Sequence, residues 1–159
     1  MDIFTVKNKK EEKFLRQKTA HFDFSKYSKK EIRELIKTMR QVMKDYLGIG
    51  LSANQIGLNI KVFVAQVANK FYSVFNPEII EYSSETSPLE EGCLSIPETF
   101  GKVERPEKVI LVGQDSQGKK IKIKAWGLLA RVFQHETDHL NGKLFIDRAK
   151  SVKRLESSK

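Results

Sequence analysis

The chain has 159 residues, of which 40% are hydrophobic and 31% charged, and its formal net charge is +9. This balance is typical of a globular protein with a hydrophobic core rather than of a disordered or membrane chain. We expect a single domain over residues 1–159 without disulfides, because Cys93 is the only cysteine. No apolar run is long enough to span a bilayer, and the charged N-terminal stretch does not resemble a signal or transit peptide. We therefore expect a cytoplasmic protein with no membrane partner.

The first predicted element is a helix over residues 29–47, in which apolar residues recur at three- and four-residue spacing. Ser28 and Glu31 are expected to form a capping box at its start. Gly48 follows the last periodic residue, where we expect the chain to leave the helix through a left-handed conformation.

Two strand pairs are predicted next. Residues 61–67 and 71–80 are rich in β-branched and aromatic side chains, and Asn69-Lys70 is a plausible tight turn between them. Residues 109–112 and 121–126 form a second pair, in which isoleucine alternates with lysine near the end.

The last predicted element is a helix over residues 127–140, with a buried stripe that includes Leu128 and Val132, and Asn141-Gly142 ends it. The tail over residues 149–159 is expected to be frayed or helical at the surface. A helix, antiparallel strands and a final helix predict an α+β fold, with mostly antiparallel strands packed around a central C-terminal helix.

The final helix carries the pattern His135-Glu136-Thr137-Asp138-His139. Residues four apart share one helical face, so both imidazoles can reach one metal ion, and Glu136 lies beside it as a candidate base. Two zinc-protease patterns would place the third ligand downstream, but one has Phe145 at that position and the other has only Glu156 in the polar tail. Both protease interpretations therefore lack a ligand.

Cys93 is the candidate for the missing ligand. A lone cysteine is often a small buried hydrophobic residue, but a thiolate beside an unfilled ligand position binds a divalent ion strongly. The third histidine, His21, is expected to be a surface residue.

The sequence resembles the peptide deformylase family over roughly residues 46–148. Three motifs carry the resemblance in the family's order: Gly48–Gln55, Glu91–Ser95 and Gln134–Leu140. Two positions depart from the family pattern. Ser52 stands where the family usually has alanine, and Glu11 stands where it usually has proline.

The resemblance and the residue chemistry together predict a complete site. We expect the metal ligands Cys93, His135 and His139, the general base Glu136, and oxyanion donors from the Gln55 carboxamide and, by resemblance, the Leu94 backbone N–H. Residues expected to bind substrate near the glycine-rich segment and the last helix are Gly48, Ile49, Gly50, Val132 and Phe133.

The resemblance implies hydrolysis of the N-formyl group of N-formylmethionyl nascent peptides, with release of formate. One divalent ion is expected, with ferrous iron favoured and nickel, cobalt or zinc as alternatives that a mixed nitrogen and sulfur site also suits. The excess of lysine indicates either solvated faces or a weak contact with the ribosome, and we expect a monomer. Two alternatives stay open: a zinc peptidase of broader specificity, and a basic nucleic-acid-binding module in which a metal only stabilises the fold.

Overall fold

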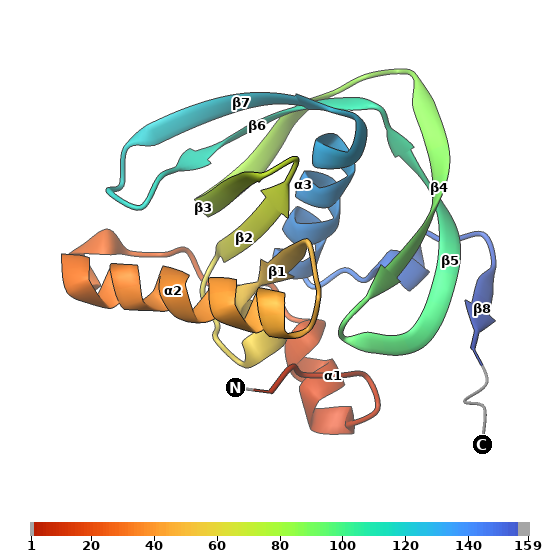
Figure 1. Cartoon of the computed structure of the whole chain (residues 1–159), viewed down its shortest axis with the longest axis horizontal. Helices are drawn as coiled ribbons and strands as arrows, with labels where there is room; N and C mark the ends of the chain where they lie inside the picture. Colours follow the sequence, from red (N-terminus) through yellow and green to blue (C-terminus); the bar gives the residue numbers. More distant parts are fainter. Residues whose placement is uncertain (1, 156–159) are drawn as a thin grey trace.

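The computed structural model describes residues 2–155 (Figure 1). Its strands form a five-stranded sheet in the order β1-β2-β3-β6-β7 and a three-stranded sheet in the order β4-β5-β8, with every pairing antiparallel. The predicted α+β class is confirmed. The elements in chain order are α1 (Lys9–Leu15), η1 (Phe24–Lys26), α2 (Lys29–Asp45), β1 (Gly50–Ser52), η2 (Ala53–Ile56), β2 (Val62–Val67), β3 (Lys70–Tyr82), β4 (Thr86–Cys93), β5 (Ile96–Pro106), β6 (Lys108–Gln114), β7 (Lys120–Trp126), α3 (Gly127–Leu140), η3 (Phe145–Asp147) and β8 (Val152–Arg154).

Strand β2 explains why the five-stranded sheet is covered on both faces. Val62 and Val64 point to one face and pack with the buried side of α2, whereas Phe63 and Ala65 point to the other and pack with α3. Side chains alternate between the faces of a strand, so a run of four buried residues requires a layer on each side. The sheet therefore lies between α2 and α3.

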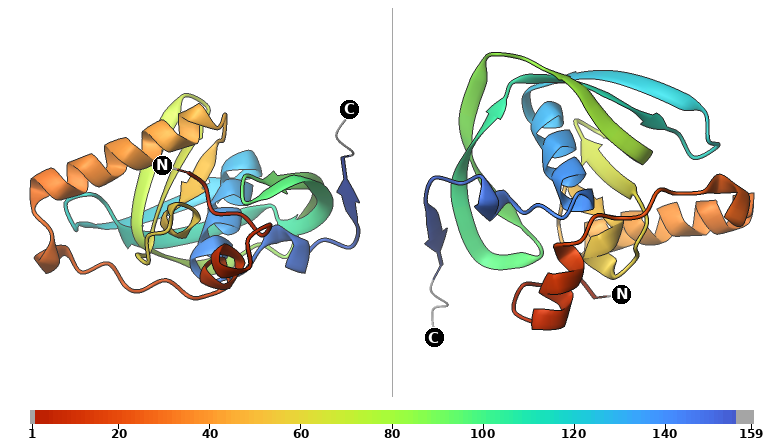
Figure 2. Two further views of the ribbon diagram at one scale, coloured as in Figure 1. Left: turned by 90° about the horizontal axis from the view of Figure 1, so that it is seen from below. Right: turned by 180° about the vertical axis from the view of Figure 1, so that it is seen from behind.

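Helix α3 lies between the five-stranded sheet and the hairpin formed by β4 and β5 (Figures 1 and 2). The ribbon of β3 continues over the top of this helix into β4, and β5 returns into β6. Backbone hydrogen bonds from Ser83 to Lys108 and from Glu107 to Glu85, both 2.9 Å, tie the two ribbons together at the bend. The second sheet thereby covers the side of α3 that faces away from the five-stranded sheet.

The N-terminal segment braces the region next to α3. The backbone N–H of Phe4 donates to the Gln55 carbonyl oxygen at 2.7 Å, and that of Val6 donates to the Ser95 carbonyl oxygen at 3.0 Å. These two bonds hold η2 and the turn after β4 at a fixed spacing.

Both predicted turns of the first half are displaced by one residue. The left-handed residue after α2 is Leu47, with φ of 57°, and Gly48 follows it and donates its N–H to the Met43 carbonyl oxygen at 2.9 Å. This is a Schellman motif. In the hairpin of β2 and β3 the turn residues are Ala68 and Asn69, both with positive φ, as a type I′ turn requires.

The prediction that the tail is frayed or helical was wrong for its described residues. Residues 152–154 form β8, which pairs with Thr99–Gly101 of β5, and residues 156–159 lie outside the described part of the chain. The helix α1 and the strands β4 and β5 were not predicted. Leu128 was expected in the buried stripe of the last helix, but it is 51% exposed because it lines a cleft.

The lysines of β7 have a structural explanation. Lys120, Lys122 and Lys124 are exposed and alternate with half-buried isoleucines along the strand at one edge of the five-stranded sheet. Charged lysines on an edge strand disfavour pairing with another sheet. Among residues 2–155, no helix is both long and apolar enough to cross a bilayer.

Candidate metal centre

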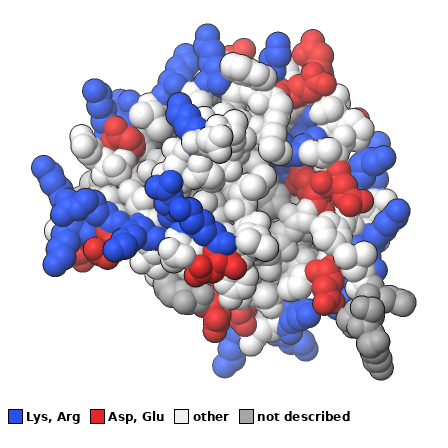
Figure 3. All heavy atoms as spheres, viewed as in Figure 1, with Lys and Arg blue, Asp and Glu red and all other residues white. Residues whose placement is uncertain are grey.

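A cleft of about 760 Å³ lies between the segment after α2, the β4–β5 hairpin and α3. Uncharged surface occupies the centre of the face drawn in Figure 3. Lysine and arginine side chains over α2 border it on one side, and charged side chains over β4 and β5 border it on the other. Apolar side chains are prominent in the lining, as expected for a pocket that binds an apolar side chain. They include Ile3, Leu47, Ile49, Leu89, Leu94, Ile96, Leu128 and Val132.

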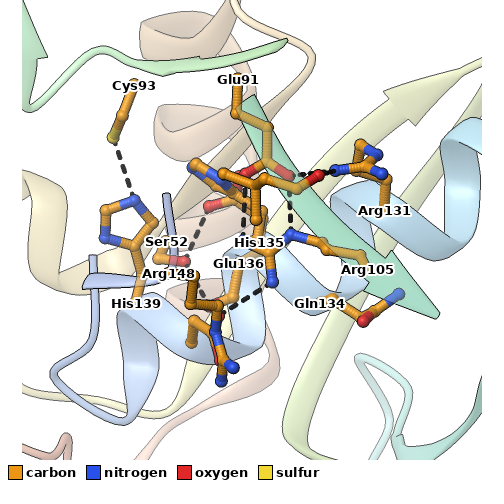
Figure 4. A network of polar contacts seen from close by, with 12 residues as sticks. Ser52, Glu91, Cys93, Arg105, Arg131, Gln134, His135, Glu136, His139 and Arg148 are labelled. Carbon is orange, nitrogen blue, oxygen red and sulfur yellow. Dashed lines mark hydrogen bonds and ion pairs between the residues drawn. The ribbon is translucent and has the colours of Figure 1, made fainter. Parts of the chain in front are cut away.

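The structure brings Cys93, His135 and His139 together at this cleft. Cys93 ends β4, and the two histidines lie four residues apart on α3. One ligand atom from each residue lies within 4.8 Å of the others, and Cys93 Sγ is 3.0 Å from His139 Nε2 (Figure 4). One sulfur and two imidazole nitrogens at this spacing fit a single divalent ion.

The electrostatics of the cluster also fit a metal ion. Burial alone would raise the pKa of the Cys93 thiol, but the charge of His139 and hydrogen bonds from both histidines lower it well below its usual value. Burial would likewise lower the pKa of His135, yet its hydrogen bonds with Cys93 and Glu91 raise it well above the ordinary range. The site therefore favours a thiolate beside a protonated imidazole, and a divalent cation can take the place of that proton.

Glu91 orients His135 from behind. Its carboxylate accepts a hydrogen bond from His135 Nδ1 at 3.0 Å, which leaves Nε2 of that ring for a metal. The same carboxylate accepts from Arg105 Nε at 2.6 Å and Nη2 at 3.0 Å, and from Arg131 Nη1 at 2.6 Å. Burial would raise the pKa of Glu91, but the hydrogen bonds from His135 and Arg105 outweigh it and hold the pKa far below its usual value. Glu91 is thus a carboxylate fixed in place by three basic side chains.

The network extends from Glu91 toward the surface (Figure 4). Arg105 also donates to Asp138 at 3.0 Å, and Asp138 accepts two further hydrogen bonds from Arg148. Arg131 donates to the Val103 and Ser87 carbonyl oxygens of the two strands of the hairpin. These contacts fix α3 against β4 and β5.

Sequence reasoning assigned none of these supporting roles. Glu91, Arg105, Arg131 and Asp138 come from four positions whose partners are distant in the chain, so no local periodicity connects them. The only available signal was the occurrence of charged residues within the motifs and on the otherwise apolar face of the last helix.

Glu136 lies in α3 at the edge of the cleft and is 4% exposed. It follows the ligand candidate His135 and does not belong to the cluster of ligand atoms. Burial raises the pKa of its carboxyl group, although the positive charges of His135 and His139 oppose this shift. A buried carboxyl group with a raised pKa beside a candidate metal site is a candidate for accepting and donating a proton.

The amide orientation of Gln55 is set by its neighbours. Its Oε1 accepts from the Ser52 backbone N–H at 2.9 Å, so its Nε2 faces Ser95 Oγ at 3.1 Å and Cys93 Sγ at 3.6 Å. A hydrogen-bond donor is therefore aimed at the cluster. Leu94, directly after Cys93, lines the same cleft.

Four of the five residues expected to bind substrate line the cleft, namely Gly48, Ile49, Gly50 and Val132. Phe133 does not line it and needs correction. Its ring is fully buried on the opposite side of α3, where it packs against Phe63 and Tyr72 in the core of the five-stranded sheet. Leu89 and Leu128, which were not predicted for this role, line the cleft instead. His21 is exposed and lies apart from the cluster, as expected.

Comparisons with known proteins agree with this geometry. The model of the polypeptide deformylase family matches residues 2–155. The peptide deformylase of Thermotoga maritima is 45% identical over 124 residues, which cover 78% of this chain and 76% of that protein. That of Carboxydothermus hydrogenoformans is 46% identical over 123 residues, covering 77% and 80% of the two chains.

Solved structures extend the similarity to the whole fold. The crystal structure of the Thermotoga maritima enzyme has a TM-score of 0.84 at 37% identity and covers 94% of this chain and 97% of its own. The crystal structure of the Synechococcus elongatus enzyme in complex with actinonin has a TM-score of 0.86 at 36% identity, with coverage of 95% and 79%. The chain therefore belongs to the polypeptide deformylase family, and it is a metal-dependent hydrolase that removes the N-formyl group from nascent polypeptides.

Proposed function

We propose that Cys93, His135 and His139 hold the catalytic divalent ion of this deformylase and that Glu136 is its general base. The observation that carries the proposal is the convergence of one sulfur and two imidazoles within 4.8 Å at an apolar cleft. Glu136, from the same helix, lies buried beside them without joining the ligand set. When bound, the ion supplies Lewis-acid activation of the formyl oxygen and of a water molecule.

The remaining chemistry is assigned to side chains of this chain. Glu136 takes a proton from the attacking water as its oxygen bonds to the formyl carbon. The negative charge that develops on the formyl oxygen accepts hydrogen bonds from Gln55 Nε2 and the Leu94 backbone N–H. Glu136 then passes the proton to the departing nitrogen as the C–N bond breaks, which releases formate and a free amino terminus. Gly48, Ile49, Gly50 and Val132 bind the formylmethionyl residue.

We propose ferrous iron as the native ion. Nickel, cobalt and zinc are proposed as functional replacements, because one thiolate and two imidazoles suit all four ions. Ferrous iron and a cysteine ligand are both open to oxidation. Enzyme purified without oxygen should therefore lose activity when it is exposed to air. Equal decay of aerobic and anaerobic preparations would indicate zinc instead.

The proposed roles can be tested by measuring formate release from formyl-Met-Ala-Ser alongside metal content. Glu136→Ala should retain the ion and lose about 10²- to 10⁴-fold in turnover. Cys93→Ser and His139→Ala should lose the ion. Loss of the ion from Glu136→Ala would contradict the separation of base and ligands. Internal cleavage of unformylated peptides would favour the broader peptidase.

The wider setting is proposed from composition and from the chemistry of the site. We assign residues 1–159 to one catalytic domain that acts as a monomer in the cytoplasm, where a reducing environment keeps the Cys93 thiol able to bind a metal. The net charge of +9 supports a weak, salt-sensitive contact with ribosomal RNA. Co-sedimentation with ribosomes at low salt that disappears at high salt would support this contact, and its absence at low salt would refute it.

A further inference from the structure

Ser52 ends β1 and is fully buried against the side chain proposed as the base. Its Oγ lies 2.9 Å from Glu136 Oε1 and 3.0 Å from the Glu136 backbone carbonyl oxygen (Figure 4). A serine hydroxyl has one proton, so it donates to one of these oxygens at a time. The carbonyl lies inside α3, where the N–H four residues later is its helical partner. The nearly buried carboxylate has little access to solvent, so it has the greater need of this donor.

Gly50 contacts the other oxygen of the same carboxylate. A Cβ atom built on Gly50 would lie 2.6 Å from Glu136 Oε2, closer than real Cβ contacts allow. Residues two apart in a strand share a face, so β1 presents Gly50 and Ser52 to Glu136 side by side. Gly50 leaves room for Oε2, and Ser52 can bind Oε1. The carboxylate is therefore confined at both of its oxygens by one short strand.

We propose that Ser52 is a positioning residue for the deformylation reaction. Its hydroxyl holds Glu136 Oε1, which leaves Oε2, beside Gly50 at the cleft, as the oxygen that exchanges the proton. This inference rests on the proposed role of Glu136 as the base. Since the family usually has alanine at this position, the hydroxyl adds to the basic chemistry rather than being required for it. Its loss should therefore cost far less than the loss of Glu136.

The test is a double-mutant cycle of Ser52→Ala and Glu136→Ala, assayed by formate release at high enzyme concentration. Ser52→Ala alone should lower kcat by about three- to tenfold, the range expected for one hydrogen bond, with KM and metal content unchanged. In the Glu136→Ala background it should change the residual kcat by less than about twofold, because the group that it positions is absent. Ser73→Ala, on β3 of the same sheet and half-buried, is the matched control and should keep the parent kcat.

A parent-like kcat for Ser52→Ala would overturn the inference. An equal loss of kcat in the parent and in the Glu136→Ala background would also overturn it, because the Ser52 hydroxyl would then act through the backbone carbonyl oxygen and the stability of the fold. A crystal structure supplies a readout independent of turnover: in Ser52→Ala the Glu136 carboxylate should shift or occupy more than one rotamer. A single unchanged rotamer would contradict the proposal. Parent-like turnover of Glu136→Ala would overturn the proposed base itself, whereas an inactive Glu136→Ala beside a silent Ser52→Ala would overturn this inference alone.

Discussion

Replacing Glu91 by glutamine removes a buried negative charge that faces two guanidinium groups. The exposed fraction of the Glu91 side chain is 6%, and those of Arg105 and Arg131 are 3% and 9%. Breaking a buried ion pair by removing one partner costs about 3–5 kcal/mol, because the other charge is left without compensation. Asp138 still pairs with Arg105 at 3.0 Å, so we expect the lower end of this range, about 3 kcal/mol. In a chain of this size that lowers Tm by about 6–12 °C.

The same substitution should weaken metal binding. Glu91 accepts the Nδ1 proton of His135, and loss of such a partner of a ligating histidine typically lowers metal affinity about 10- to 100-fold. Calorimetry of the metal-free protein and competition with a chelator measure the two effects separately. Glu104→Gln is the matched control, because Glu104 lies on β5, the strand paired with β4, and its ion pair with Lys150 at 3.6 Å is exposed. Such a pair is worth less than about 1 kcal/mol. A Glu91→Gln variant with the parent Tm and affinity would refute the reasoning.

Two further predictions concern the base and an ion pair far from it. Gly50→Ala should lower kcat more than about tenfold with metal retained, because the added Cβ would lie 2.6 Å from Glu136 Oε2 and must displace this oxygen. Steady-state kinetics measure the effect, and a variant with the parent kcat would contradict the prediction. For Asp147, burial would raise the pKa, but the Leu144 backbone N–H and the Arg16 guanidinium outweigh it and lower the pKa below its usual 3.8. A depressed carboxyl pKa adds stability above the unfolded value and loses it as pH falls through the folded value. The Arg16–Asp147 pair is about one-third exposed, so Asp147→Asn should lower Tm by only about 1–3 °C near neutral pH. The difference in Tm between the parent and the variant should shrink below pH 3.8. A difference in Tm that stays constant with pH would be inconsistent with this account.

The sequence predicted those helices and strands in which buried hydrophobic residues recur at a regular spacing. The last helix has the predicted bounds because apolar residues repeat along it and Asn141-Gly142 ends it, with Gly142 at φ of 76°. Strand β4 has only one buried residue, Glu91, and β8 has none, so neither shows an alternation of hydrophobic side chains. Both strands are held by pairing with β5, which depends on residues distant in the sequence.

The candidate site divides in the same way. The two histidines could be paired from their spacing, and Cys93 could be added because the ligand set was incomplete; their catalytic roles stay predictions. Phe133 was misplaced because a helix with buried residues on several sides does not reveal which side faces the cleft. The charged partners of Glu91 could not be found, because hydrogen bonds between residues far apart in the chain depend on the completed fold.

X-ray absorption spectroscopy of the zinc-loaded protein tests the central claim most directly. The account predicts one sulfur neighbour at about 2.3 Å and two imidazole nitrogens at about 2.0–2.1 Å, with the sulfur contribution lost in Cys93→Ser. A first shell of nitrogen and oxygen alone in the parent protein would contradict the assignment of Cys93, His135 and His139 as the ligand set.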